Sequence, residues 1–238
     1  MPAVEVKDLD KNYGSFKGVK GISFEVEDRE VFGLIGPNGA GKTTTLRVIA
    51  TLLEISGGSV NVFGHDLAKE PHEVRKILSY LPEDAGAYKN LTGRDYLRFI
   101  ANFFASGQAA KDIVARGIEI AALGNRIDDK VNTYSKGMTR RLLVGRALMT
   151  NPRLAILDEL TSGLDVVNAQ EIRKIVKDIA RNGTTVLLSS HNMLEVEYMC
   201  DRIALINDGV IVEMGTPAGL KKKYDASNIE DVFMRVIT

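Results

Sequence analysis

A glycine-rich segment near residue 40 constrains this chain more than any other part of its sequence. It reads Gly36-Pro37-Asn38-Gly39-Ala40-Gly41-Lys42-Thr43 and follows the apolar run 31–35, which is typical of a buried strand. The residues after it, 44–50, are typical of the first turns of a helix. Strand, glycine-rich loop and helix in this order are the context that a phosphate-binding loop of the form G-x-x-x-x-G-K-[ST] requires.

The chemistry of a phosphate group explains these residue types. Glycines let the backbone turn tightly, so that several N–H groups point at one anion, and the helix N-terminus adds partial positive charge. Lys42 is expected to reach the β- and γ-phosphates of a nucleotide, and the hydroxyl of Thr43 to ligate magnesium. We therefore expect a nucleoside triphosphate to bind along the loop, from Gly36 through Thr43 to Thr44.

Composition limits the partners of the chain. Its 238 residues suit one α/β domain with a sizeable subdomain, and 45% hydrophobic content is enough for a full core. Lys plus Arg and Asp plus Glu are equal at 31 each, which argues against nucleic acid as a partner. The single cysteine fits a reducing compartment, the charged N-terminus is no signal peptide, and no apolar run approaches the ~18 residues of a membrane span.

The order of predicted elements divides the chain into one globular unit with an insert. Residues 1–83 and 150–215 read as an α/β core, in which Asn207-Asp208-Gly209 signals a hairpin. Residues 84–149 read as a helical subdomain, and 216–238 as a short tail.

Two helices are predicted within 84–149. The first carries an apolar stripe with Thr92 as its N-cap, and the stripe consists of Tyr96, Phe99, Ile100, Phe103 and Phe104. The second repeats this spacing at Ala110, Ile113, Val114, Gly117, Ile118 and Ala121. We expect most aromatics of 88–104 to pack within the insert; the alternative is that they form a docking surface.

A second strand supplies the carboxylates that a phosphate site needs. The apolar run 154–157 ends in Asp158-Glu159. Carboxylates at a strand end are often merely solvated, but a parallel sheet brings the carboxyl ends of its strands to one edge, where ligands bind. Asp158 is then expected near Thr43, where it can hold Mg²⁺, and Glu159 is expected to polarise the attacking water.

These motifs, together with Ser162-Gly163-Leu164-Asp165 and His191 in this order, resemble the ATP-binding subunits of ABC transporters. The resemblance implies an α/β fold: a P-loop NTPase core of RecA-like type with a mostly parallel sheet, an antiparallel β region and a helical subdomain. It also implies that Tyr13 stacks on adenine and that His191 contacts the γ-phosphate. Ser135 and Gly137 align with the signature motif that grips the nucleotide of the other subunit, and Asp165 resembles the aspartate that communicates between the two sites.

Three departures from the family pattern stand out. Glu83 replaces a glutamine that normally touches the metal, and it is retained here as a candidate Mg²⁺ ligand. Lys136 and Met138 replace the first glycine and the glutamine of the signature. Leu160 stands where a proline usually follows the catalytic glutamate.

The resemblance implies a function as well. Two copies are expected to meet head to tail with ATP and Mg²⁺ between them, hydrolyse ATP, and drive a separate transmembrane permease of the exporter-type branch from the cytoplasmic face of the membrane. The alternative is a non-transport ATPase of the same family, in DNA maintenance or iron–sulfur assembly. The DNA version normally needs long coiled coils or a basic groove, and neither is apparent in the sequence.

Overall fold

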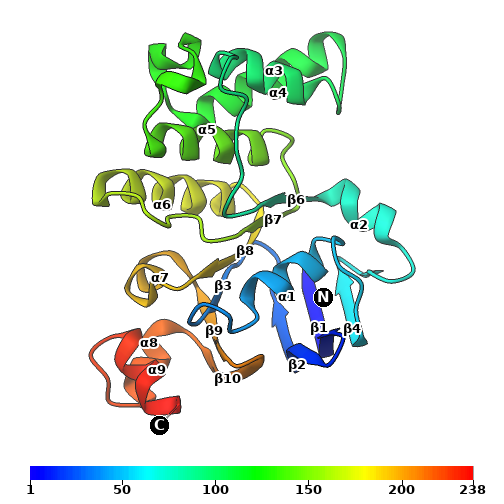
Figure 1. Ribbon diagram of the computed structural model, residues 1–238, viewed down its shortest axis with the longest axis vertical. Coiled ribbons are helices and arrows are strands. Elements are labelled where there is room, and N and C mark those ends of the chain that lie inside the picture. Colours follow the sequence, from blue (N-terminus) through cyan, green and yellow to red (C-terminus); the bar gives the residue numbers. More distant parts are fainter. Residues whose placement is uncertain (238) are drawn as a thin grey trace.

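A mostly parallel sheet of six strands forms the centre of the molecule (Figure 1). The computed structural model describes residues 1–237, apart from the side chain of Glu195. In spatial order the strands are β10 (Val210–Gly215), β9 (Arg202–Asn207), β3 (Val31–Ile35), β8 (Thr185–Ser190), β7 (Leu154–Leu157) and β6 (Leu78–Leu81). All neighbours pair in parallel except β10, which runs antiparallel to β9 across the predicted hairpin. The expected α/β sheet is confirmed.

This sheet is apolar on both faces because its side chains alternate between two hydrophobic clusters. Val31 and Ile35 of β3 pack on one side, and Phe32 and Leu34 pack on the other. A strand with both faces covered reads as a continuous apolar run, which explains the sequence pattern of residues 31–35.

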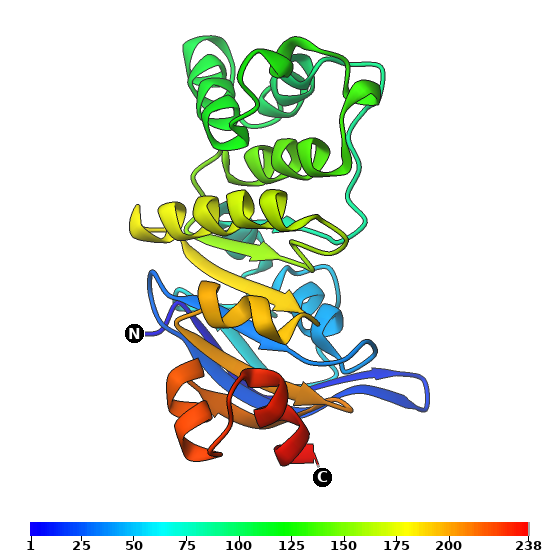
Figure 2. The same ribbon diagram turned by 90° about the vertical axis from the view of Figure 1, so that its left-hand side faces the viewer.

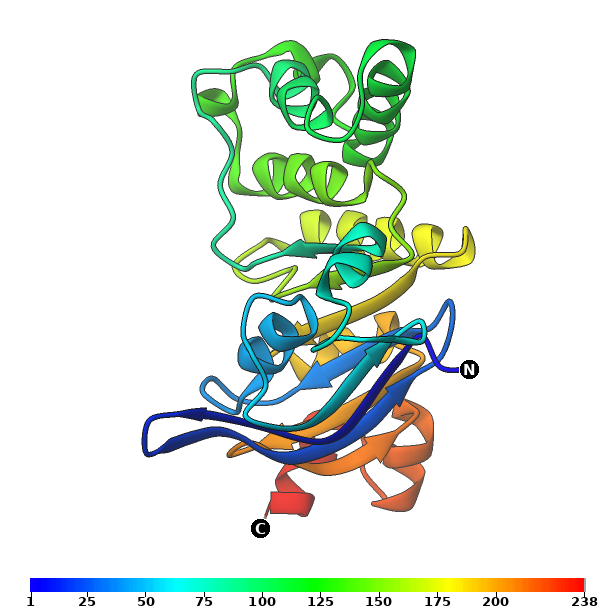
Figure 3. The same cartoon turned by 90° about the vertical axis from the view of Figure 1, so that its right-hand side faces the viewer.

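A second, antiparallel sheet covers one face. Its strands are ordered β2 (Phe16–Val26), β1 (Val4–Tyr13), β4 (Gly57–Val62) and β5 (His65–Asp66). The helices α1 (Lys42–Ile49) and α2 (Pro71–Ile77) lie on the same side of the molecule. The β1–β2 hairpin projects beyond the rest of the sheet as a two-stranded arm (Figure 3).

Helices cover the opposite face and extend the molecule (Figure 2). Next to the sheet lie α6 (Val166–Arg181) and α7 (Met193–Met199), and farther along the chain lie α8 (Pro217–Lys223) and α9 (Ile229–Ile237). Beyond α6 come α3 (Gly93–Ala101), α4 (Gly107–Ala121), the 3-10 turns Gly124–Asp128 and Val131–Thr133, and α5 (Lys136–Leu148). The predicted N-cap of α3 is confirmed, since Thr92 accepts a 3.0 Å hydrogen bond from the N–H of Asp95.

The aromatic stripe predicted for α3 is wrong in part. The helix ends at Ala101, so Phe103 and Phe104 lie beyond it and cannot continue its buried face. The buried residues are Gly93, Tyr96, Leu97 and Ala101. Phe99, Phe103 and Phe104, together with Tyr88, are 42–72% exposed, so the expectation that most of these aromatics pack inside the insert is also wrong.

Candidate functional site

The glycine-rich loop joins β3 to α1, as the sequence predicts. Gly39 and Gly41 have φ values of 82° and 102°, in the left-handed region that favours glycine. A side chain at Gly36 would lie 2.0 Å from the carbonyl oxygen of Ile206. The loop therefore needs glycine for two reasons, its turn and its close approach to β9.

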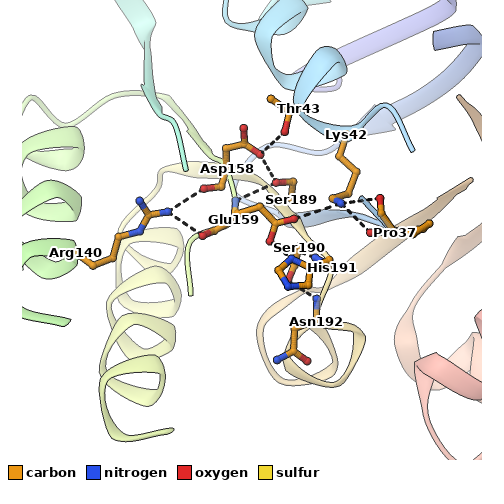
Figure 4. Close-up of polar contacts among 11 residues, drawn as sticks. Pro37, Lys42, Thr43, Arg140, Asp158, Glu159, Ser189, Ser190, His191 and Asn192 are labelled. Atoms are coloured by element: carbon orange, nitrogen blue, oxygen red, sulfur yellow. Dashed lines mark hydrogen bonds and ion pairs between the residues drawn. The ribbon is translucent and has the colours of Figure 1, made fainter. Parts of the chain in front are cut away.

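Lys42 is the first residue of α1, and its ammonium lies inside the loop (Figure 4). It donates hydrogen bonds to the carbonyl oxygens of Gly36 (2.8 Å) and Pro37 (3.1 Å), and it lies 3.3 Å from Oε1 of Glu159. Lys42 and Glu159 are each 5% exposed. The cation expected to meet phosphate thus has a carboxylate as its counter-ion in the protein without nucleotide.

Asp158 follows β7 directly and accepts hydrogen bonds from three hydroxyl groups. Thr43 donates to Oδ1 at 3.1 Å, Ser189 donates to the same oxygen at 2.5 Å, and Tyr80 donates to Oδ2 at 3.2 Å. Burial and the charge of Asp158 raise the pKa of Tyr80 to about 12, so its hydroxyl keeps its proton at neutral pH. The paired oxygens of Thr43 and Asp158 are hard donors of the kind that Mg²⁺ prefers.

Glu159 has a strained backbone and a carboxylate that lies between the side chains of Lys42 and His191. Its φ is 47°, which is uncommon for a residue with a side chain. Its N–H donates to Ser189 Oγ at 3.0 Å, and its Oε2 lies 2.7 Å from Nδ1 of His191. Glu159 and His191, two residues that the sequence predicts for the site with separate roles, are therefore in direct contact, and Lys42 lies beside the other carboxylate oxygen.

A cavity of about 260 Å³ opens beside these groups. Its lining residues come from the hairpin arm, the loop, the β6–α3 connection and the end of β7: Phe16, Gly18, Asn38, Gly39, Gly41, Lys42, Thr43, Thr44, Glu83 and Glu159. Glu83 thus faces the same cavity as Lys42 and Thr43, at the position where the sequence departs from the family pattern.

Tyr13 lies at the end of β1 and does not line this cavity. It is 46% exposed, and its ring packs over Gly18, where an added Cβ would lie 3.2 Å from Cε2 of Tyr13. Phe16, which is 63% exposed, lines the cavity instead. Sequence reasoning missed Phe16, although both aromatics belong to the same hairpin.

The signature residues lie at the start of α5, away from the lining of this cavity. Ser135 caps α5 by accepting a hydrogen bond from the N–H of Met138 at 3.2 Å. Gly137 lies against Asn168, since an added Cβ would be 2.3 Å from that side chain. Asp165 caps α6 by accepting from the N–H of Asn168 at 3.0 Å.

Three further groups at the site were not predicted from the sequence. Tyr80 and Ser189 sit on β6 and β8, the two strands that flank β7, and both reach Asp158. Arg140 of α5 donates to the backbone around Asp158 and Glu159 (Figure 4). The Ser189-Ser190 pair at a strand end was the only local signal, because the contact of Tyr80 depends on the order of strands in the sheet and that of Arg140 on where α5 packs.

The site joins a G-x-x-x-x-G-K-[ST] loop to two carboxylates at the edge of a mostly parallel sheet, with Thr43 on Asp158 and Lys42 on Glu159. This combination defines the class of P-loop nucleoside triphosphatases. Comparison with known proteins narrows this class. The family model described as ABC transporter matches residues 19–162.

Two curated relatives cover most of the chain. It is 37% identical to the linearmycin resistance ATP-binding protein LnrL of Bacillus subtilis, over 95% of this chain and 73% of that protein. It is 38% identical to the daunorubicin/doxorubicin resistance ATP-binding protein DrrA of Streptomyces peucetius, over 94% of this chain and 68% of that protein. A solved ATP-binding subunit of an ABC transporter superposes with a TM-score of 0.86 at 27% identity, over 99% of this chain and 100% of that one.

The chain belongs to the family of ABC transporter ATP-binding subunits, in its exporter-type branch. It binds ATP and hydrolyses it to drive transport, and the alternative of a non-transport ATPase is not supported by these relatives. Within residues 1–237, no helix combines the length and apolar character that crossing a bilayer would take.

Proposed function

We propose that this chain powers export through a separate transmembrane permease by hydrolysing Mg·ATP at the cavity beside Lys42. The observation that carries the proposal is the direct contact of Glu159 with both Lys42 and His191, next to the Thr43–Asp158 pair. In this proposal Lys42 and the loop N–H groups bind the phosphates, Glu159 orients and polarises the water, and His191 contacts the γ-phosphate. The resistance functions in the names of LnrL and DrrA favour outward transport of an antibiotic-like compound.

Thr43, Asp158 and Glu83 are the residues that we propose would hold Mg²⁺ when the nucleotide is bound. Among the side chains that the structure describes, no three of His, Cys, Asp or Glu are grouped to hold a metal by themselves. This fits Mg²⁺, which is usually held by one or two carboxylates together with substrate phosphates. When bound, the ion neutralises charge that develops on the phosphates during transfer.

Glu83→Gln is expected to change how strongly Mg²⁺ helps ATP to bind. A carboxylate facing a triphosphate repels it unless a cation lies between them, so the variant should bind metal-free ATP better than wild type. It should also lose part of the gain that Mg²⁺ brings. The measurement is ATP affinity with Mg²⁺ and with EDTA for both proteins, and an unchanged ratio would remove Glu83 from the metal site.

Tyr13→Ala is expected to weaken ATP binding about tenfold or more, because stacking of a base on an aromatic ring is worth roughly 1–3 kcal/mol. Tyr13→Phe should bind nearly as well as wild type. Phe16→Ala is the matched comparison, since Phe16 lines the cavity and lies on the same hairpin. A loss confined to Phe16→Ala in equilibrium binding of ATP would move the stacking role to Phe16.

We further propose a head-to-tail dimer in which Ser135, Gly137 and Asp165 of one copy face the nucleotide held by the loop of the other. ATP-binding subunits of this family dimerise and pair with transmembrane subunits. Ser135 and Gly137 open a helix of 13 residues, whose N-terminus favours an anion, yet neither residue lines the cavity of its own chain. A second copy would bring such a helix to each cavity.

Mixing Ser135→Ala chains with Lys42→Ala chains should restore part of the ATPase activity that each lacks alone. Mixed dimers contain one site with an intact loop from one chain and an intact signature from the other. The control places both substitutions in one chain and mixes it with wild type, which creates no intact site in the mixed dimers. A rate in the first mixture no higher than that of the two variants measured separately would contradict the trans arrangement.

The permease is proposed to dock on an aromatic patch made of Tyr88, Phe99, Phe103 and Phe104. The rings of Tyr88, Phe99 and Phe103 meet edge to face, with centroids 5.5 Å apart for Tyr88–Phe99 and 5.2 Å for Phe99–Phe103, and Phe104 is exposed beside them in the chain. Large exposed apolar patches mark interaction sites. We assign the patch to a helical subdomain of residues 84–149, inserted in a core made of residues 1–83 and 150–215. We also propose that the contact with the permease holds the chain at the cytoplasmic face of the membrane. Co-purification with the membrane subunit tests the docking directly.

A further inference from the structure

Arg140 is a buried arginine whose hydrogen-bond partners are all backbone carbonyl groups. It lies in α5 and is 8% exposed. Its Nε donates to Leu160 at 2.8 Å, and one terminal nitrogen donates to both Asp158 and Glu159 at 2.9 Å. The other terminal nitrogen donates to Pro82 at 3.3 Å and to Glu83 at 3.0 Å. One side chain therefore joins two separate segments of the site.

Placing a guanidinium here is costly to the fold. Burial lowers the pKa of Arg140, and the charges of Glu83, Asp158 and Glu159 oppose this shift. An apolar side chain could fill the space without desolvating a charge. The five carbonyl contacts therefore indicate that the role of the guanidinium is to position the backbone segments that it binds.

What it positions is the turn that aims the carboxylate of Glu159. This residue has a φ of 47°, a conformation that persists only where the surroundings enforce it. Arg140 holds the carbonyls on both sides of the strained residue, at Asp158 and at Glu159 itself. With the backbone fixed in this way, the side chain extends toward Lys42 and His191 (Figure 4).

The same side chain connects this turn to the helix that begins with the signature residues. Ser135 caps α5, and Arg140 lies five positions further along the helix. A shift of α5 would move the backbone at Glu83 and at Glu159 together, because both carbonyl groups accept hydrogen bonds from the Arg140 guanidinium. Arg140 thus links the part of α5 that faces a partner nucleotide to the chain's own catalytic carboxylate.

We propose that Arg140 is a positioning residue that fixes the Glu159 turn and the Glu83 segment to α5, and so sets the rate of ATP hydrolysis rather than the affinity for ATP. The proposal rests on the proposed role of Glu159. It concerns no phosphate contact, since Arg140 does not line the cavity beside Lys42.

The test compares Arg140→Gln and Arg140→Lys with Arg141→Ala. Arg141 is on the same helix and donates to the carbonyl of Ala122, remote from Glu159, so its loss controls for damage to α5. We expect kcat of Arg140→Gln to fall at least about tenfold with KM and ATP affinity within threefold of wild type. Arg140→Lys, which keeps a cation with fewer donors in less fixed directions, should fall between Arg140→Gln and wild type.

Each outcome supports or overturns the positioning role of Arg140. If Arg140→Gln and Arg140→Lys keep the kcat of Arg141→Ala, or lose affinity as much as rate, the positioning role is overturned. If Arg140→Gln does not fold, the kcat-to-KM split of Arg140→Lys decides. If wild type itself does not hydrolyse ATP, the proposed function fails. Cleavage after Glu83 by a glutamate-specific protease then still tests whether Arg140 holds the Glu83 segment in place. Cleavage should be faster in Arg140→Lys than in Arg141→Ala, and equal rates would refute the positioning role of Arg140.

Discussion

Glu159→Gln is expected to lose at least about a hundredfold of its ATP turnover, the usual scale for removing a general base. The amide has the shape of the carboxylate but cannot accept a proton from water. ATP affinity should be kept, because the substitution removes a negative charge that lies 3.3 Å from the Lys42 ammonium and would otherwise face the phosphates. The variant should therefore accumulate as an ATP-bound dimer in size-exclusion chromatography.

The control for this experiment is Glu119→Gln, which removes the same charge from an exposed position on α4. Turnover by Glu119→Gln should equal that of wild type. Near-normal turnover by Glu159→Gln would refute the assignment of Glu159, and failure of that variant to form a dimer with ATP would refute the head-to-tail arrangement.

Lys42→Ala is expected to bind ATP at least about a hundredfold more weakly and to show no measurable turnover. Hydrogen bonds to charged groups contribute about 1.5–3 kcal/mol each, and the ammonium can direct two of them to the β- and γ-phosphates. Equilibrium binding of a fluorescent ATP analogue measures the loss. The control is Lys69→Ala, at an exposed position outside the cavity, and wild-type affinity in Lys42→Ala would contradict the phosphate-binding role.

The same substitution should also destabilise the protein without nucleotide. Lys42→Ala leaves the carboxylate of Glu159, which is 5% exposed, without its buried cation, and unpaired buried charge is costly. The melting temperature should fall, and the double variant Lys42→Ala/Glu159→Gln should recover part of it. No recovery would show that the ion pair contributes little to the folded state.

Local patterns in the sequence were enough to predict the main parts of the site. The loop at Gly36–Thr43 needs only its flanking strand and helix, and Asp158-Glu159 needs only the rule that parallel strands end at one edge. These groups and His191 do converge. What the sequence did not show was the ion pair between Lys42 and Glu159, since the loop and the strand end are more than a hundred positions apart.

The contacts that were missed depend on tertiary neighbours. Tyr80 and Ser189 reach Asp158 because β6 and β8 flank β7, an order that no local pattern encodes. Arg140 is one of several cationic residues on α5, and no local pattern distinguishes it from the others. The stripe of α3 was extended too far because the apolar spacing continues to Phe103 and Phe104, whereas the helix ends at its C-cap, Asn102, and leaves both rings exposed.

The projecting β1–β2 hairpin has a consequence for which nucleotides the protein accepts (Figure 3). The arm carries two exposed aromatic rings, of which Phe16 lines the cavity and Tyr13 packs over Gly18, and a ring offers a flat surface rather than a pattern of donors and acceptors. Every purine and pyrimidine has such a face, so stacking discriminates poorly between bases. The phosphate-binding loop is expected to contact only the phosphates, so it does not distinguish bases either. Selectivity for adenine over guanine should therefore be small, and GTP should compete with ATP for this site at comparable concentrations.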